Sequence, residues 1–473
     1  MDLRVGPAFE GRAVVATAAS PLLTAPIGRT IIRMAAPNML AMVVTMATLM
    51  AEAWYVGQLS TEALAGLALG FPMMMLVMML SAGSFGGTIT GAVARLLGAG
   101  DREGAEVLAL HAVLMMLLLA SLCSAIFLGG GRAIYSLLGG RGIVLEQALA
   151  YSNVLFAGCV SLWLSNALAS IVRATGNMAV AAQCLLAGSL LQVLMAGGLV
   201  FGLGPLPKLG IAGAAAGIVA GNALASALLL NFLINRCAEL RLRIIGIPLK
   251  IVPITMLLKL GSLAAVNPIC TTATVMVVTA FVARLGVDVL AGYGIGARLE
   301  LLLVPMVFGF GAAATALVGV HFGANEIERG HSAGWTAATY SAVLCGLVGG
   351  AVALFPGLWA NLFTHAEAVR DACRAYLQIV GPFYSFYGVS LCLYFASQGA
   401  GRVLWPVIAS VVRVVVIVLG CIALARGPNA SAAQFFWVIA AGLAAQGLLT
   451  GAAVRLGAWT HGSARASRHP AQA

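Results

Sequence analysis

The sequence predicts an all-α membrane protein with twelve transmembrane helices in two six-helix bundles. The two bundles are related by a pseudo-two-fold axis along the membrane normal. Three observations predict this fold class: the composition, a series of apolar runs, and an internal repeat. Of the 473 residues, 61% are hydrophobic and 9% are charged, and the mean hydropathy is +1.02. A soluble domain is about a quarter charged, so this chain cannot cover a water-facing surface.

Twelve apolar runs reach the length of about twenty residues that a bilayer requires. The runs Leu64–Ala94 and Val289–Val320 are too long for one untilted span, so we expect tilt or an extension beyond the bilayer. The first six runs are Ile32–Val56, Leu64–Ala94, Val107–Leu128, Ala148–Val172, Ala179–Gly202 and Ile211–Ile234. The second six are Leu260–Val282, Val289–Val320, Gly334–Leu354, Ala375–Ala396, Leu404–Leu424 and Phe435–Val454.

The second six runs repeat the pattern of the first six. Because six spans is an even number, both copies enter the membrane from the same side, and the repeat is parallel. A tandem repeat in a membrane protein usually places the working site between its copies, which points to a transporter. Leu59, Leu64, Ala65, Gly66, Gly70 and Gly83 recur at the same spacing as Leu285, Leu290, Ala291, Gly292, Gly296 and Gly309. With a one-residue slip, Gly98, Ala99, Glu103 and Gly176 match Gly323, Ala324, Glu328 and Gly401.

The 26 Lys and Arg residues predict the orientation, because cytoplasmic loops carry an excess of them. Most fall on the side of the two termini, so we expect a multi-pass inner-membrane protein with both termini cytoplasmic. We expect a tail at 1–30, a first bundle at 31–236, a basic linker at 237–259, a second bundle at 260–457 and a tail at 458–473. The N-terminus lacks a signal-peptide pattern, the linker is expected along the membrane surface, and the last tail is expected to be disordered.

The composition also argues against several function classes. The net charge of +11 lies mainly in loops, with no Lys/Arg cluster among aromatics, so nucleic acid is not an expected partner. The nine cysteines show no CxxC spacing, and we expect neither a metal site nor a disulfide framework. No nucleophile motif or metal-spaced cluster supports an enzyme. We expect no cofactor, a monomer in the lipid bilayer, and small molecules as the substrates.

Several motifs resemble the multidrug and toxic compound extrusion (MATE) antiporters. The resemblance runs from about Ile31 to Val454. It rests on the stretches Ala51–Gly66 and Gly292–Glu300, Pro305, Ala314–Gly319, Gly323-Ala324, the turn Arg173–Asn177 and its second copy Gln398–Arg402.

This resemblance implies a twelve-helix secondary transporter that expels organic cations and other drugs in exchange for protons or sodium. The family acid of the first span falls on Glu52, ahead of Gly57. A second acid of some members, in the fifth span, falls on Ala196, and the nearby polar position is Gln192. Sodium-linked members carry acids in the seventh and tenth spans, and this chain has none there, which weakens the case for sodium coupling.

Glu52 is the first candidate site residue. Thr45, Thr48, Glu52 and Tyr55 share one helical face, and a polar stripe should face the bundle interior or a water-filled cavity. Desolvation favours the protonated form of a buried carboxylate, which suits a proton carrier. The alternative is a glutamate that simply reaches the interface at the outer end of its helix.

The second copy repeats this stripe only in part. It keeps Thr271 and Thr274 but has Val278 and Phe281 in place of Glu52 and Tyr55. We therefore expect the chemistry to be asymmetric, with the ionisable group in the N-terminal half alone.

Arg298 and Glu300 are the second candidates. They are two residues apart, so they do not share a helix face and each needs its own partner. They are interpreted either as structural or gating charges or as a functional pair. Tyr384 and Tyr387 in the tenth span could line a cavity that stacks on cations, or could anchor the helix at the interface.

We therefore expect a proton-driven antiporter that exports amphipathic or cationic small molecules by alternating access. The alternatives are a sodium-coupled exporter, a lipid-linked precursor flippase, and a polytopic membrane enzyme. A flippase would need a more basic cavity for a phosphate headgroup, and cations within the spans are scarce (Arg298 and Arg413). A sodium site would need several converging oxygens.

Overall fold

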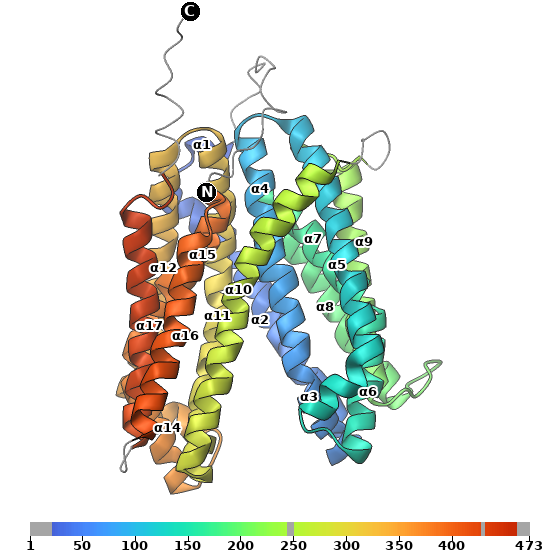
Figure 1. Cartoon of the computed structure of the whole chain (residues 1–473). Helices are drawn as coiled ribbons and strands as arrows, with labels where there is room; N and C mark the ends of the chain where they lie inside the picture. The colour runs from blue at the N-terminus through green and yellow to red at the C-terminus, as the bar shows by residue number, and fades with distance from the viewer. Residues whose placement is uncertain (1–20, 244–249, 427–430, 461–473) are drawn as a thin grey trace, which may run out of the picture.

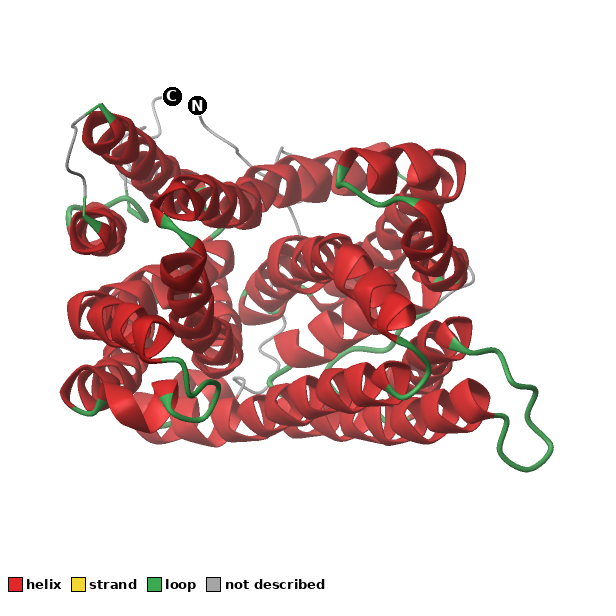
Figure 2. Cartoon of the chain, turned by 90° about the horizontal axis from the view of Figure 1, so that it is seen from below, coloured by secondary structure: helices red, strands yellow, loops and turns green. Residues whose placement is uncertain are grey.

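A computed structural model describes residues 21–243, 250–426 and 431–460 (Figure 1). Within these residues the regular elements are helices, with no strand (Figure 2). Residues 1–20 of the predicted tail 1–30, residues 461–473 of the predicted tail 458–473 and linker residues 244–249 lie outside the described residues. The first predicted tail ends too late, because a helix already begins at Ile27. The all-helical prediction is therefore confirmed for the part of the chain that can be compared.

The helices fall into two consecutive sets. The first is α1 (Pro21–Thr24), α2 (Ile27–Gly57), α3 (Thr61–Met78), the π-helix η2 (Met79–Phe85), α4 (Gly86–Gly98), α5 (Arg102–Leu137), α6 (Gly142–Ala157), α7 (Cys159–Ala174), α8 (Met178–Phe201) and α9 (Ile211–Asn235). The second is α10 (Ile251–Val282), η3 (Ala283–Leu285), α11 (Val287–Gly323), α12 (Ile327–Leu354), α13 (Pro356–Ala360), α14 (Glu367–Val380), η4 (Gly381–Phe383), α15 (Tyr384–Ala400), α16 (Leu404–Ala425) and α17 (Ala432–Arg455). We call α2–α9 the N bundle and α10–α17 the C bundle.

Eleven helical segments among the described residues can span a membrane, and twelve if α6 and α7 form one broken span. The fourth apolar run, Ala148–Val172, is not one straight helix. It is divided between α6 and α7, which meet at Gly158 with a bend of 49°. Val219 of α9 lies against Gly158, where a Cβ atom would collide with it. The two long runs are confirmed as the unbroken helical segments Thr61–Gly98 and Val287–Gly323.

The start of α2 and the end of the described chain lie at the same end of the molecule, which we call the termini end. Arg329 of α12 donates a hydrogen bond to the Ala25 carbonyl at 3.2 Å. Trp459 meets Phe322 at the close of α11, with ring centroids 5.9 Å apart. The bundles lie side by side near the termini end and separate towards the opposite end, which we call the far end (Figure 1).

The bundles join where α4 crosses α11, a contact that we call the seam, and also where α11 packs on α2 and α10 packs on η2. A Cβ atom on Gly98 would collide with the Val320 carbonyl, and one on Gly323 would collide with the Arg95 carbonyl. Val320 and Gly323 are the second-copy counterparts of Arg95 and Gly98, so the two contacts are the same contact made twice about the pseudo-two-fold axis. Only glycine allows this approach, because small residues let helix backbones meet in a membrane protein.

The π-helix η2 explains the one-residue slip in the repeat. Gly83 matches Gly309 and Gly98 matches Gly323, so the first copy holds one more residue between its two glycines than the second copy does. A π-turn absorbs a single extra residue within a continuous helix, and Gly83 lies within η2, which ends at Phe85. The second copy runs through the matching stretch as regular α-helix.

The first part of the linker packs on the N bundle, where the sequence predicted a segment along the membrane surface. Leu240 and Leu242 are buried in the core beside α5. The Glu106 carboxylate accepts the Arg241 backbone N–H at 3.2 Å and lies 3.4 Å from the Arg243 guanidinium. The helix α10 begins at Ile251, so the last residues of the expected linker are helical.

We predict that Gly98→Leu separates the bundles at the termini end, because the new side chain cannot fit against the α11 backbone. Spin labels at the exposed positions Asn235 and Ser332 should move apart by several ångströms in pulsed electron paramagnetic resonance. Gly129→Leu is the matched control, because nothing lies within 4 Å of a Cβ at Gly129. Unchanged distances in the Gly98→Leu protein would show that the seam tolerates a side chain.

Candidate functional site

Glu52 lies inside the N bundle. It is 3% exposed, and neither carboxylate oxygen has a hydrogen-bond partner among the described residues. The carboxylate interacts electrostatically with the Tyr151 hydroxyl of α6. Tyr151 is fully buried, and its hydroxyl donates to the Met74 sulfur at 3.2 Å. A buried carboxylate with so little compensation strongly favours its neutral form.

The polar stripe of α2 points into the N bundle, with differing exposure along it. Thr48 is 4% exposed, and its hydroxyl donates to the Thr45 carbonyl at 2.7 Å. Thr45 donates to the Ala41 carbonyl at 2.9 Å. Both hydroxyl protons are therefore used within the helix, so these oxygens are left as acceptors. Tyr55 packs on α8, with its ring 5.8 Å from that of Phe201.

Gln192 does not join Glu52. It is 8% exposed on α8 and lies against Gly221 of α9. Because the Glu52 oxygens have no hydrogen-bond partner in the described chain, Gln192 does not supply one. In the C bundle, Thr271 donates to the Asn267 carbonyl at 3.1 Å and Thr274 to the Cys270 carbonyl at 2.9 Å. The second stripe thus keeps the packing of the first without its acid.

The C bundle carries its acid on a different helix, against the equivalent tyrosine. Tyr376 is the second-copy counterpart of Tyr151, and its hydroxyl donates to Glu300 at 2.6 Å. Glu300 in turn matches Met74, which is the partner of Tyr151 in the first copy. The expectation that the N-terminal half alone carries the ionisable group is therefore wrong. Comparison of the two polar stripes misses Glu300, because it lies on a different helix from Val278, although its place within a span already made it a candidate.

Glu300, unlike Glu52, has both a hydrogen-bond donor and a cation beside its carboxylate. Its carboxylate lies 4.0 Å from the guanidinium of Arg413, which is 5% exposed in its side chain. Arg413 also donates to the Gln446 amide oxygen at 3.3 Å and lies 5.9 Å from the Tyr387 ring centroid. These contacts join α11, α14, α16, α17 and α15 inside the C bundle. Tyr384 and Tyr387 are both buried there, so neither is an interfacial anchor.

Arg298 points away from Glu300. It is exposed, and its guanidinium lies 5.8 Å from the Phe363 ring centroid. The two residues have separate partners, as their spacing predicts, but the interpretation of Arg298 as a buried gating charge is not supported by its exposure. The cation that pairs with Glu300 is Arg413.

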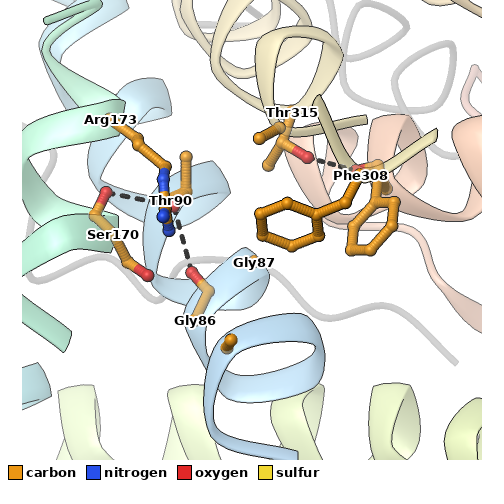
Figure 3. A pocket seen from close by; sticks show the side chains of 10 residues that line it. Gly86, Gly87, Thr90, Ser170, Arg173, Phe308 and Thr315 are labelled. Carbon is orange, nitrogen blue, oxygen red and sulfur yellow. Dashed lines mark hydrogen bonds between the residues drawn. The ribbon is translucent and has the colours of Figure 1, made fainter. Parts of the chain in front are cut away.

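A small cavity of about 10 Å³ lies within the seam (Figure 3). Thr90 of α4 donates to the Ser170 carbonyl at 3.0 Å, and Thr315 of α11 donates to the Phe395 carbonyl at 2.8 Å, again as a symmetric pair. Arg173 of α7 lines the cavity with its guanidinium 5.5 Å from the Phe308 ring centroid. The motif pattern identified Arg173 only as part of a turn, and its burial was not foreseen.

The comparisons with known proteins fit this geometry. The model of the MatE family matches residues 37–196 and 264–422, one match in each bundle. The chain belongs to the MatE family. The resemblance to MATE transporters and the two-bundle fold are thereby confirmed, and the chain is a multi-pass membrane transporter for small molecules rather than an enzyme.

Relatives and solved structures cover most of this MATE chain. A protein named FAD transporter from Shewanella oneidensis is 25% identical over 85% of this chain and 89% of its own length. A probable multidrug resistance protein NorM from Thermotoga maritima is 24% identical over 82% and 83%. A MOP superfamily transporter from Pyrococcus furiosus shares the fold, with a TM-score of 0.86 and 21% identity over 93% of this chain and 98% of that chain.

We predict that Glu300→Ala lowers the free energy of unfolding by about 3 kcal/mol, because it leaves the buried Arg413 cation without its acid. The double variant Glu300→Ala/Arg413→Met should lose less, since no unpaired charge remains. Denaturant titration of the purified protein in detergent measures both. Arg298→Ala is the control and should change stability by less than about 0.5 kcal/mol. Equal losses in the single and double variants would contradict the ion pair.

Proposed function

We propose that this MATE protein exports amphipathic, often cationic, small molecules across the inner membrane in exchange for protons. The observation that carries the proposal is Glu52, a carboxylate that is 3% exposed and has no hydrogen-bond partner in the described chain. It lies inside one of two bundles that separate towards the far end (Figure 1). Acids inside a membrane span mark ion pathways by default. Tyr151 beside it can donate to the carboxylate when the proton leaves, in place of its bond to Met74.

The position of the seam indicates from which side of the membrane the proton and the substrate each reach the protein. With both termini in the cytoplasm, as the basic residues predict, the seam closes the cytoplasmic end and the far end faces outwards. A proton from outside neutralises Glu52, whereas deprotonated Glu52 favours a cationic substrate. Proton and substrate then prefer different arrangements of the two bundles, and this difference is the coupling free energy that drives exchange.

The relatives support a small-molecule exporter of this kind. Two are named probable multidrug resistance protein NorM, and another is named FAD transporter. We propose that Thr45, Thr48 and Tyr55 lie along the substrate path of the N bundle, with Thr271, Thr274, Tyr384 and Tyr387 in the equivalent part of the C bundle. Gln192 faces α9 and is a weaker candidate. A single chain holds both bundles, so we propose a monomer that needs no cofactor.

Protons are proposed over sodium because of the surroundings of Glu52. A sodium ion requires several converging oxygens, and among the described residues no group of three or more His, Cys, Asp or Glu side chains is placed to hold a metal ion. The helices α10 and α15 hold no acid. Sodium coupling and lipid-linked precursor flipping are the alternatives that the following experiment separates.

We predict that Glu52→Gln abolishes ethidium accumulation driven by a pH gradient in everted vesicles, with at least a tenfold loss of initial rate. Glutamine keeps the shape of the side chain but cannot carry a proton. Fluorescence of ethidium under a pure pH gradient, and separately under a pure sodium gradient, measures the effect.

The matched control is Glu62→Gln, which makes the same change at an exposed acid in the first turn of α3. It should keep the native rate. Persistence of proton-driven transport in Glu52→Gln would remove Glu52 as the coupling residue. Transport of the native protein under the sodium gradient alone would favour the sodium alternative, and the absence of any cation transport would favour a lipid-linked substrate.

A further inference from the structure

Two arginines of the N bundle lie at the seam without an acid. Arg173 is 2% exposed and its Nε has no hydrogen-bond partner in the described chain. Arg95 donates to the carbonyls of Gln398 and Gly399, at 3.0 and 2.5 Å. Among the described residues, neither guanidinium forms an ion pair with a carboxylate. A buried cation without a counter-charge is costly, so an unpaired Arg173 requires an explanation beyond packing.

At two equivalent places of the seam, the N bundle has an arginine and the C bundle has none. The second-copy counterparts of Arg95 and Arg173 are Val320 and Gln398, so the C bundle presents no cation at either equivalent place. Gln398 is itself incompletely bonded: its amide nitrogen donates to the Gly83 carbonyl at 3.1 Å, while its amide oxygen has no partner in the described chain. The two copies therefore share the backbone arrangement at the seam but differ there in charge.

Across the seam, the two guanidinium groups contact backbone carbonyls and one aromatic ring of the C bundle. Arg95 is held by carbonyls of α15, and Arg173 lies over the Phe308 ring of α11. Figure 3 shows the Arg173 guanidinium beside Thr90, with Phe308 and Thr315 on the facing helix. In alternating access the bundles must part at this end. Both guanidinium groups then lose these partners together and face the water that enters.

We propose that Arg173 and Arg95 form a binding site for the phosphate group of a substrate that enters at the termini end. The planar guanidinium fork binds phosphate oxygens in pairs, and two forks on one wall match the charge of a phosphate monoester. The proposal rests on the transporter function above and adds a chemical group to its substrates. The phosphate belongs either to a soluble phosphoester or to a lipid headgroup, which share this chemistry.

The test uses phenylglyoxal, which modifies exposed guanidinium groups, and peptide mass spectrometry of the purified protein. We expect Arg173 to be modified slowly as the seam opens, and riboflavin 5′-phosphate to slow this at least fivefold at millimolar concentration. Riboflavin, which differs only by the phosphate, should give no protection. Exposed Arg284, which lies over the Phe281 ring, is the internal control and should react alike in all samples. Failure of Arg173 to react, or equal protection by both flavins, would overturn the proposal.

A variant measures the same site through transport. Arg173→Gln installs the residue that the second copy already has at the equivalent position, and it should lower uptake of riboflavin 5′-phosphate into everted vesicles at least tenfold relative to ethidium. Arg284→Gln should leave the ratio unchanged. An equal loss for both compounds would assign Arg173 a purely structural role and overturn the proposal.

Two further experiments distinguish a lipid from a soluble phosphate ligand, and the phosphate site from the proton-coupling proposal. Phosphatidic acid, whose headgroup is a phosphate monoester, should protect Arg173 when added to the detergent micelles if a lipid headgroup is the ligand, and should not if the ligand is a soluble phosphoester. The protection assay requires no ion gradient. If Glu52→Gln keeps its phosphate-dependent protection while native transport proves independent of protons, the coupling proposal fails and the phosphate site stands.

Discussion

The close approach of α4 and α11 is the contact on which the arrangement of the two bundles depends. In a membrane, helices gain no hydrophobic energy by leaving lipid for each other, so their association depends on packing and on interhelical hydrogen bonds. Gly98 and Gly323 let each backbone touch the other, and Arg95 adds hydrogen bonds to carbonyls across the contact. Because the same contact is made twice about one axis, a rotation of one bundle breaks both halves together. Such a seam favours two discrete states over a gradual opening.

The two bundles also differ in whether their buried charged groups have hydrogen-bond or ion-pair partners. Glu300 has Tyr376 and Arg413, and the cost of burying each charge is offset by its partners. In the described chain, the two Glu52 oxygens and the Arg173 Nε have no hydrogen-bond partner, and neither residue forms an ion pair. Both belong to the N bundle, one near the far end of α2 and one at the seam. An uncompensated group responds to a proton or an anion, whereas a compensated one resists change. The N bundle therefore carries the groups that can sense ligands, and the C bundle holds its acid in a fixed network.

The spans and the repeat could be predicted from the sequence because they follow from local composition and from glycine spacing. The break at Gly158 could not, because hydropathy averages over the run in which it lies, and the bend depends on Val219 of another helix. The position of Glu52 on an inward face followed from helical periodicity. Its neighbour Tyr151 did not, because α6 lies far along the chain. The same limit applies to Arg298: spacing separates it from Glu300 but does not say which of the two faces inwards.

The single extra residue of the first copy shows how both ends of one helix keep their partners. Before the π-turn, Met74 matches Glu300, and each contacts the equivalent tyrosine. After it, with the register shortened by one position, Thr90 matches Thr315, and each bonds the equivalent carbonyl. One residue turns an α-helix by about 100°, so without η2 an added residue would rotate either the tyrosine contact or the seam out of place. The π-turn absorbs the insertion locally, and the tyrosine contact and the seam remain on one continuous helical segment in each copy.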